Sequence, residues 1–265
     1  MKQKRIRKLV TAGMYLIIII TMFIPTITAN IVNDTNVFEK ETKGSDDINI
    51  INNLIVDVNG GGNYTKIQDA INNATDGDFI QVWDGVYKEN IIINKTLNVF
   101  GNSSKTTTIE GFGVNNSAVT IAANEAIFSG FTVQGGDFIG IELVVSQGVK
   151  ISENNINNNT YGIWVFISSN NIIQNNNFMN NLEEAVSISL GLKNQVINNN
   201  FINNTGEKGQ AFFWNSLFNK WQENYWDDYS GSGAKKIQGQ FDILSISIPW
   251  ANYDRNPQTE PYDIE

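Results

Sequence analysis

Three acidic groups in the second half of the chain are of the residue type that performs acid–base chemistry on sugars. They are Asp137, the adjacent Glu183 and Glu184, and Glu207. Retaining glycosidases hold two carboxyl groups about 5 Å apart, and neighbouring strands of a sheet lie about 4.8 Å apart. Glu184 and Glu207, on adjacent repeats, could form such a pair. Solvated loop acids give the same pattern, and their oxygens would also suit Ca²⁺.

The composition removes most other chemistries. The chain has no His and no Cys. It therefore lacks the usual general base, the usual transition-metal ligands and any Ser–His or Cys–His nucleophile. We expect no cofactor other than, at most, Ca²⁺. Catalysis by the acidic residues alone is still possible, but the absence of His and Cys favours a binding protein over an enzyme.

An aromatic set gives the best candidate for recognition. In the strands that begin near Gly140, alternate positions should point outward and share one exposed face: Glu142, Val144, Trp164, Phe166 and Phe213. An exposed aromatic patch usually marks an interaction site. Flat rings beside the Glu142 acceptor suit the apolar face and the hydroxyls of a sugar. The alternative is that residues 241–250 lie over this face and bury it.

A repeated unit positions these side chains. Four 16-residue steps each end in Asn and an apolar residue: Gly140 to Ile156, Gly162 to Phe178, Ala185 to Phe201 and Gly209 to Tyr225. The connections vary, so that the full period is 22 to 24 residues. A fixed body with one variable loop edge is typical of a solenoid.

The period predicts an all-β fold, a right-handed parallel β-helix of about six coils. Inward positions should alternate along each long strand: Ile141, Leu143 and Val145, then Ile163, Val165 and Ile167, then Val186, Ile188 and Leu190, then Gln210, Phe212 and Trp214. Asn at each corner tolerates the left-handed backbone of a tight turn and can bond to its copies along the axis. The apolar residues that follow these Asn should stack inside: Ile156, Phe178, Phe201 and Tyr225.

Both ends of such a coil need a cap. A short helix from Tyr64 is predicted at the N-terminal end, with Thr65 and Gln68 at capping-box spacing. Its apolar face consists of Ile67, Ala70, Ile71 and Ala74. An irregular aromatic cap is expected at the other end, where Trp221, Trp226 and Trp250 cover the core and Asp227–Asp228 belong to the turn.

The N-terminal residues indicate export. Five basic residues precede an apolar run from Leu9 to Ile27, which predicts a signal peptide or membrane anchor over residues 1–29. We assign residues 30–53 to a polar linker, 54–229 to the β-helix and 230–265 to a C-terminal cap and tail. Without residues 1–29 the chain has 13 basic and 27 acidic residues, a net charge of −14. This charge disfavours nucleic acid, and it disfavours acidic polysaccharides unless a divalent cation bridges them. Contact with a membrane is expected only through the N-terminal segment.

Two segments resemble the opening of pectin-lyase-like β-helix proteins. They are Tyr64-Thr65-Lys66-Ile67-Gln68-Asp69-Ala70-Ile71 and Gly77-Asp78-Phe79-Ile80-Gln81-Val82-Trp83-Asp84-Gly85-Val86-Tyr87. The Asn-rich repeats and Glu223-Asn224-Tyr225-Trp226-Asp227-Asp228-Tyr229 resemble the NosD-like group, whose members are described as carbohydrate-binding and sugar-hydrolase (CASH) domains, and archaeal surface members in particular. The resemblance implies the β-helix and an extracellular setting. It implies no activity, because the matching motifs maintain the fold. The Gly-His-Gly motif of polygalacturonases is missing, and Arg255 is the only arginine outside residues 1–29 that could serve a lyase.

The sequence therefore predicts a secreted or surface-anchored β-helix that binds a polysaccharide or an envelope glycoprotein, or that acts as an envelope scaffold. Two alternatives remain. One is a carbohydrate-active enzyme that uses Glu184, Glu207 or Asp137. The other is a purely structural component of the envelope.

Overall fold

The computed structural model describes residues 51–243 and 245–264, and the predicted export segment lies outside them. The chain divides into two units. The larger comprises residues 51–241 and 249–265 and is described here. The smaller unit comprises residues 1–50 and 242–248. Of these the structure describes residues 242–243 and 245–248, at the turn between the last two strands and in the strand ends beside it. Within the described ranges, no helix has the length and apolar character needed to cross a bilayer.

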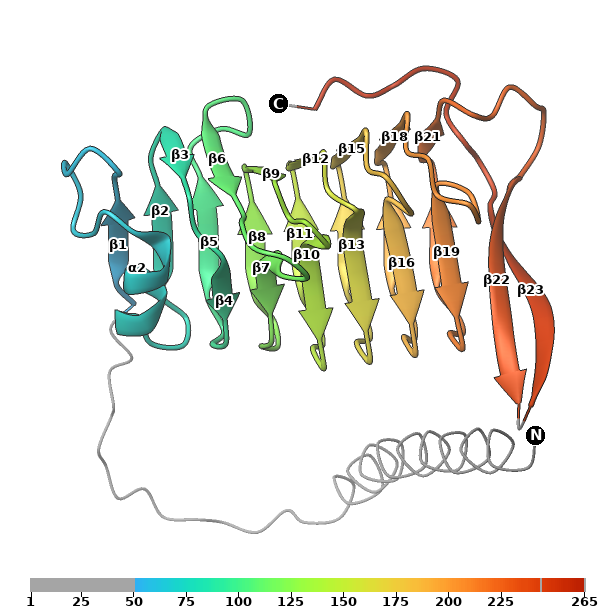
Figure 1. The fold of residues 1–265 in the computed structure, drawn as a ribbon, viewed down its shortest axis with the longest axis horizontal. Coiled ribbons are helices and arrows are strands. Elements are labelled where there is room, and N and C mark those ends of the chain that lie inside the picture. The colour runs from blue at the N-terminus through green and yellow to red at the C-terminus, as the bar shows by residue number, and fades with distance from the viewer. Residues whose placement is uncertain (1–50, 244, 265) are drawn as a thin grey trace, which may run out of the picture. The chain divides into compact units, whose positions relative to one another are not determined.

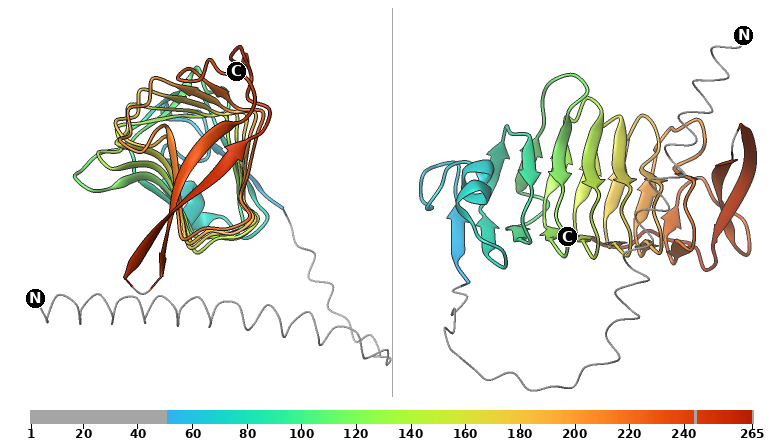
Figure 2. Two further views of the ribbon diagram at one scale, coloured as in Figure 1. Left: turned by 90° about the vertical axis from the view of Figure 1, so that its right-hand side faces the viewer. Right: turned by 90° about the horizontal axis from the view of Figure 1, so that it is seen from below.

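The larger unit is a coil of short parallel strands arranged in three faces (Figure 1). The first face contains β1 (Asn53–Val56), β2 (Phe79–Val82), β5 (Asn98–Gly101), β8 (Ile127–Ser129), β11 (Lys150–Ser152), β14 (Ile172–Gln174), β17 (Gln195–Ile197) and β20 (Lys220–Gln222). The second face contains β3 (Gly85–Tyr87), β6 (Thr107–Glu110), β9 (Thr132–Gln134), β12 (Asn155–Asn157), β15 (Asn177–Met179), β18 (Asn200–Ile202) and β21 (Tyr225–Trp226). The third face contains β4 (Ile91–Ile93), β7 (Ser117–Ile121), β10 (Ile139–Val144), β13 (Tyr161–Phe166), β16 (Val186–Ser189), β19 (Ala211–Trp214) and β22 (Lys235–Ile243). The last strand, β23 (Ile246–Asp254), is a neighbour of both β20 and β22, and seen along the axis the coils superimpose (Figure 2).

The predicted all-β parallel β-helix is confirmed, and the predicted number of coils is wrong. The structure has about eight turns instead of six. Two short segments each bend around a corner and contribute two strands. The corner between β8 and β9 is at Gly130, whose φ of +83° is in the left-handed region that favours glycine. The segment from Tyr87 to Ile93 is also divided into two strands, because a corner separates β3 from β4.

The last coil is shifted by one residue from the predicted alignment. The structure pairs Asn200 with Tyr225 and Phe201 with Trp226, so the repeat begins at Gln210 and not at Gly209. A slip of one residue turns every side chain of a strand to the opposite face. The buried stack consequently ends in Trp226 in place of Tyr225, with ring centroids 5.0 Å apart for Phe178–Phe201 and 3.9 Å for Phe201–Trp226.

The predicted inward positions are confirmed in the middle of each strand and wrong at the ends. Ile141, Leu143 and their counterparts in the next two coils are buried. Val145, Ile167 and Leu190 instead occupy corners with positive φ, and Val145 is exposed. In the last long strand Ala211 and Phe213 point inward, and Phe212 and Trp214 alternate with them.

Buried asparagine ladders run along the corners. Each ladder Asn follows a corner residue with positive φ, as Asn176 follows Asn175. The Asn176 Oδ1 accepts the backbone N–H of Asn154 at 3.1 Å and its Nδ2 at 3.0 Å. Asn176 in turn donates its N–H and Nδ2 to Asn199 Oδ1. The three buried ladders are Asn154–Asn176–Asn199–Asn224, Asn159–Asn181–Asn204 and Asn171–Asn194–Asn219.

The predicted asparagine ladder exists in part: its first three members form it, and the fourth, Asn224, belongs to a buried ladder instead. Asn155, Asn177 and Asn200 form an outer ladder on the second face, with Nδ2 to Oδ1 distances of 2.7 and 2.6 Å. The C-terminal segment runs back over this ladder (Figure 1), where Tyr262 exchanges two hydrogen bonds with Asn200. The described tail thus lies over β15, β18 and β21 of the second face. The predicted boundary at residue 229 falls before β22, which still pairs in parallel with β19.

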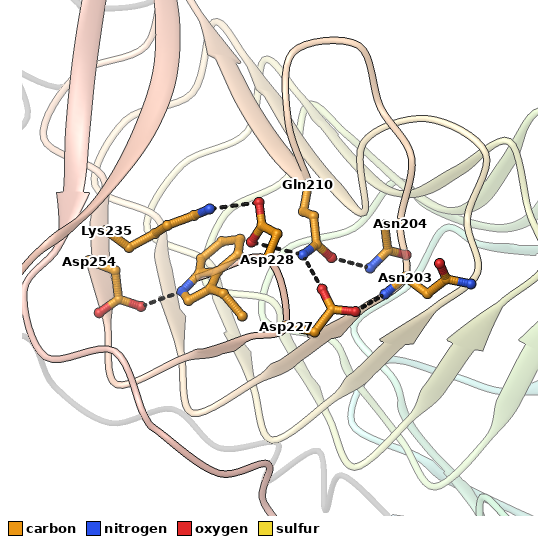
Figure 3. A network of polar contacts seen from close by, with 8 residues as sticks. Asn203, Asn204, Gln210, Asp227, Asp228, Lys235 and Asp254 are labelled. Carbon is orange, nitrogen blue, oxygen red and sulfur yellow. Dashed lines mark hydrogen bonds and ion pairs between the residues drawn. The ribbon is translucent and has the colours of Figure 1, made fainter. Parts of the chain in front are cut away.

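Two of the three buried ladders end on acidic side chains (Figure 3). The fully buried carboxylate of Asp254 accepts the N–H groups of Glu223 and Asn224, the Asn224 Nδ2 and the Trp226 Nε1, at 2.8 to 3.0 Å. A second ladder continues from Asn204 to Gln210 Oε1, whose Nε2 donates to Asp227 and Asp228. Lys235 lies 2.7 Å from Asp228. Of the predicted covering tryptophans, Trp221 and Trp226 are buried and Trp250 is half-exposed.

At the N-terminal end, α2 (Ile67–Asn73) packs its predicted apolar face into the core. The expected capping box of Thr65 and Gln68 is absent. The N-cap residue is Lys66, and no side chain at that position forms a capping hydrogen bond. Glu89, 22 residues away, instead accepts the N–H groups of Ile67 and Gln68 at 2.9 and 3.0 Å. A carboxylate from the next coil thus replaces the local cap.

Asp254→Asn is expected to lower the free energy of unfolding by at least about 2 kcal/mol, because an amide nitrogen would replace a carboxylate oxygen that accepts buried donors. Urea denaturation would measure the loss. Asp263→Asn is the matched control, since Asp263 is exposed in the tail. Equal stability of the two variants would show that the hydrogen bonds of Asp254 at the end of the ladder do not stabilise the fold.

Candidate functional site

Three aromatic rings form a cluster on the third face, which we call the aromatic shelf. Tyr161 and Trp164 lie three residues apart on β13, and Phe138 comes from the loop that enters β10. The ring centroids are 5.4 Å apart for Phe138–Tyr161, 5.8 Å for Phe138–Trp164 and 5.6 Å for Tyr161–Trp164. All three side chains are half-buried, so that the shelf keeps part of each ring open to solvent.

Three of the four predicted ligand-binding residues lie on β10 and β13: Trp164 belongs to the shelf, and Glu142 and Phe166 lie beside it. Glu142 on β10 and Trp164 on β13 are directly paired in register, and Phe166 follows on the same strand. The Glu142 carboxylate accepts a hydrogen bond from Ser117 Oγ at 2.9 Å, and Trp164 Nε1 donates to Ser189 Oγ at 3.2 Å. These bonds fix the orientation of an acceptor and of an indole on adjacent strands.

The fourth predicted residue, Phe213, is not part of this surface. Its side chain is 0% exposed and packs against Gly239 of β22, where a side-chain carbon would collide with the ring. The prediction failed because the last coil is shifted by one residue, which exchanges the inward and outward positions. Trp214 takes its predicted place instead, paired through Ser189 with Phe166, and Phe212 is paired through Ser187 with Trp164.

The predicted acidic residues gather at the same edge of the third face. Glu184 aligns with Tyr161 through the bond from Gly162 N–H to the Glu184 carbonyl. Its side chain is only 5% exposed, and burial raises the pKa of the Glu184 carboxyl. The charges of Glu183 and Glu207 raise this pKa further, whereas Lys208 lowers it. Burial raises the pKa of Tyr161, and the charges of Glu184 and Glu183 raise it further.

The remaining candidates are more open. Asp137 and Glu207 are exposed, and Thr160 Oγ1 donates to the Asp137 carbonyl at 2.8 Å. Lys208 lies over the ring of Phe212, 4.1 Å from its centroid. Within residues 51–243 and 245–264, no three His, Cys, Asp or Glu side chains converge on one point. The predicted Ca²⁺ site stays a prediction.

Sequence reasoning missed Phe138, Tyr161 and Lys208 as members of this site. Tyr161 carried a signal, since it precedes Trp164 by three residues at the start of the same strand. Phe138 carried none, because only the loop geometry brings its ring against Trp164. The arrangement offers flat rings, a fixed carboxylate and a nearly buried acid, surrounded by more acidic than basic groups. It suits contact with an uncharged, hydroxyl-bearing surface.

Comparison with known proteins identifies the fold and one relative. The model of a family described as the right handed beta helix region matches residues 97–234. A cell surface glycoprotein of Methanothermus fervidus is 35% identical over 114 residues, which are 42% of this chain. The chain spans only 19% of that relative's length.

Two solved structures are similar to this chain. The alginate lyase from Paenibacillus sp. str. FPU-7 has 15% identity and a TM-score of 0.56, with 66% of each chain covered. The pectin methylesterase from carrot has 15% identity and a TM-score of 0.39, with 71% of this chain and 64% of that chain covered. The likeness to the lyase concerns the fold alone, and the second is too distant to carry an argument.

The buried Glu184 predicts a pH-dependent effect of Glu184→Gln on stability. Because the pKa in the folded state is raised from the ordinary 4.5, the protonated carboxyl favours folding. That contribution is fully present below about pH 4.5 and is lost as the pH rises through the folded-state pKa. Gln mimics the protonated form at every pH, so the variant should be more stable than the wild type near pH 8 and similar near pH 4. Thermal unfolding at both pH values would measure the difference. Glu260→Gln, at an exposed position in the tail, serves as the control.

Proposed function

This chain belongs to the right-handed β-helix family, and we propose that it acts at the cell surface by binding an uncharged glycan on the aromatic shelf. The observation that carries the proposal is the cluster of three part-exposed rings beside Glu142, whose carboxylate is held by Ser117. Aromatic faces cover the C–H surface of a sugar ring, and a fixed carboxylate accepts its hydroxyl protons. The glycan would belong to an envelope polysaccharide or glycoprotein.

A surface setting is supported by two independent features. The relative from Methanothermus fervidus is named a cell surface glycoprotein. The first 29 residues of this chain have the composition of an export segment. Membership of the NosD-like group, a finer assignment than the β-helix family, stays a prediction.

Charge supports an uncharged ligand over a uronate polymer. Around the shelf lie Asp137, Glu142, Glu183, Glu184 and Glu207, and Lys208 is the basic residue nearest to them. Like charges placed opposite each other oppose binding and suppress wrong partners. The ligand proposed here therefore differs in charge from the alginate in the name of the lyase.

Glu184 favours a second candidate, hydrolysis of the bound glycan. A carboxyl group with a raised pKa, close to other acids, is the usual form of a general acid in glycoside hydrolysis. Against it stands the low exposure of Glu184, which leaves little of the carboxyl within reach of a substrate. Binding without cleavage is therefore the first proposal, and a scaffold without a ligand is the remaining one.

Trp164→Ala is expected to weaken binding of uncharged polysaccharides about tenfold or more, because it removes the ring that contacts both other rings of the shelf. Retention of the purified chain on a panel of insoluble and soluble polysaccharides would measure it. Trp164→Phe should keep part of the affinity. Phe218→Ala truncates a more exposed ring at a corner and is the control. Unchanged retention in Trp164→Ala would refute the shelf as the binding site.

New reducing ends in the same incubations would support the hydrolase candidate. In that case Glu184→Gln and Glu207→Gln should each lower the rate by two or more orders of magnitude, as loss of an acid or base does. Exposed Glu153→Gln, at a corner outside this site, controls for the substitution itself. Cleavage that survives in both variants would exclude these residues as the catalytic pair.

A further inference from the structure

The outer surface of the first two coils carries a second, separate aromatic site. We propose that the outward side of β2, between Phe79 and Trp83, binds a short uncharged oligosaccharide. The site lies on the first face, and the aromatic shelf lies on the third. The inference does not depend on the shelf, because no residue is shared between them.

Strand alternation aligns the two rings. Ile80 and Val82 are buried, whereas Phe79 and Trp83 on either side are 40% and 42% exposed. Gln81 lies midway between them on the same outward side. Strand residues are about 3.3 Å apart along the chain, so the two aromatic positions are about 13 Å apart. That span fits an extended oligosaccharide and exceeds a single sugar ring.

A hollow lies at each end of this strand. Next to Phe79 a shallow hollow of about 350 Å³ is lined by Ile51, Asn52, Asn53, Phe79, Gln81 and Phe100. Next to Trp83 a second hollow of about 360 Å³ is lined by Asp57, Asn59, Trp83, Asp84 and Asn102. Each hollow thus combines at least one exposed ring with amide side chains, and neither contains a basic residue.

The rings are held in place by their neighbours. Phe79 stacks on Phe100 of β5, with centroids 6.1 Å apart and planes 17° apart. The Trp83 carbonyl accepts a bond from Tyr87 Oη at 2.9 Å, and its N–H donates to Val56. Gly61 brings the adjoining turn close, because a side-chain carbon there would lie 3.5 Å from the Trp83 ring and 2.6 Å from Asp57 Oδ2.

The polar rim is also preset, and it is rich in acceptors. Asp84 Oδ1 accepts bonds from Asn102 Nδ2 at 2.8 Å and Thr106 Oγ1 at 2.6 Å. These bonds lower the pKa of Asp84 and keep it ionised at neutral pH. Asp57 is nearly buried, and its two oxygens accept the N–H groups of Asn59 and Gly61. Its charge is thus already satisfied, and Asp84 is the acid that can reach a ligand.

This combination selects the ligand class. Acceptors beside flat rings recognise groups that carry O–H donors and an apolar face, which is the surface of a sugar. The acidic rim would repel uronates and phosphates. A cation could also lie over Trp83 next to Asp84, but a single solvent-exposed carboxylate attracts a cation only weakly.

Calorimetric titration of the full chain tests the site with cello-, manno- and chitohexaose, and with tetramethylammonium as the cationic probe. Trp83→Ala should weaken binding of at least one hexaose about tenfold, and Phe79→Ala should weaken the same one, since each removes one end of the track. Asp84→Asn should have a smaller effect. Val86→Ala is the control, because Val86 is an exposed apolar residue of the adjacent strand that lines neither hollow.

The outcomes separate this site from the aromatic shelf. If both bind, the wild type has two sites, and Trp83→Ala and Trp164→Ala each remove a different one. Loss in Trp83→Ala with none in Trp164→Ala supports this site and rejects the shelf. Full hexaose binding in Trp83→Ala, binding of tetramethylammonium alone, or no binding of any hexaose at millimolar concentration would each overturn the inference.

Discussion

Every coil turns three corners, and at each corner the chain must bury peptide groups that no strand pairs. A buried N–H or C=O without a partner destabilises the fold by roughly 1 to 3 kcal/mol, so the corners set the limit on how many coils can stack. Inward-facing Asn side chains meet this requirement. Asn176 accepts the N–H of one neighbouring coil and donates to carbonyls and to the Asn of the next, so that one side chain satisfies groups of two corners. The rest of the structure depends on these ladders.

The ladders have a direction, and the ends of the coil follow from it. Each Asn donates toward the C-terminal end, so the last one needs an acceptor where no further coil exists. In one ladder Asp254 accepts directly from the last Asn, Asn224. In another, Gln210 accepts from Asn204 and donates in turn to Asp227. Serine side chains bond across another corner, where the backbone is strained. Val145 and Ile167 are β-branched residues with φ of 49°, and the neighbouring Ser146 and Ser168 bond to each other across the same corner.

The same architecture decides where ligands can be met. The core stacks occupy the inward side of all three faces, so recognition is confined to outward side chains. The tail lies over the outer asparagine ladder of the second face. Outward aromatic residues occur on the other two faces, in the first coils around Phe79 and Trp83 and in the middle coils around Trp164. A solenoid can hold such sites independently because each coil contacts only its neighbours.

The sequence alone determined the fold class, the apolar face of α2, the middle of the first three long strands and the outward position of Trp164. These follow from periodicity, which every chain segment carries locally. Only the tertiary structure decided the register of the last coil. The connection from Asn204 to Gln210 is longer than the corresponding one from Asn181 to Ala185, and a spacing rule does not show where the next strand begins, so that Phe213 turns inward. The tertiary structure also decided that Glu89 caps the helix, that Phe138 joins Trp164, and that Asp254 ends a ladder. Those contacts join residues from different coils, and it is the stacking of coils, each about 4.8 Å from the next, that brings them together.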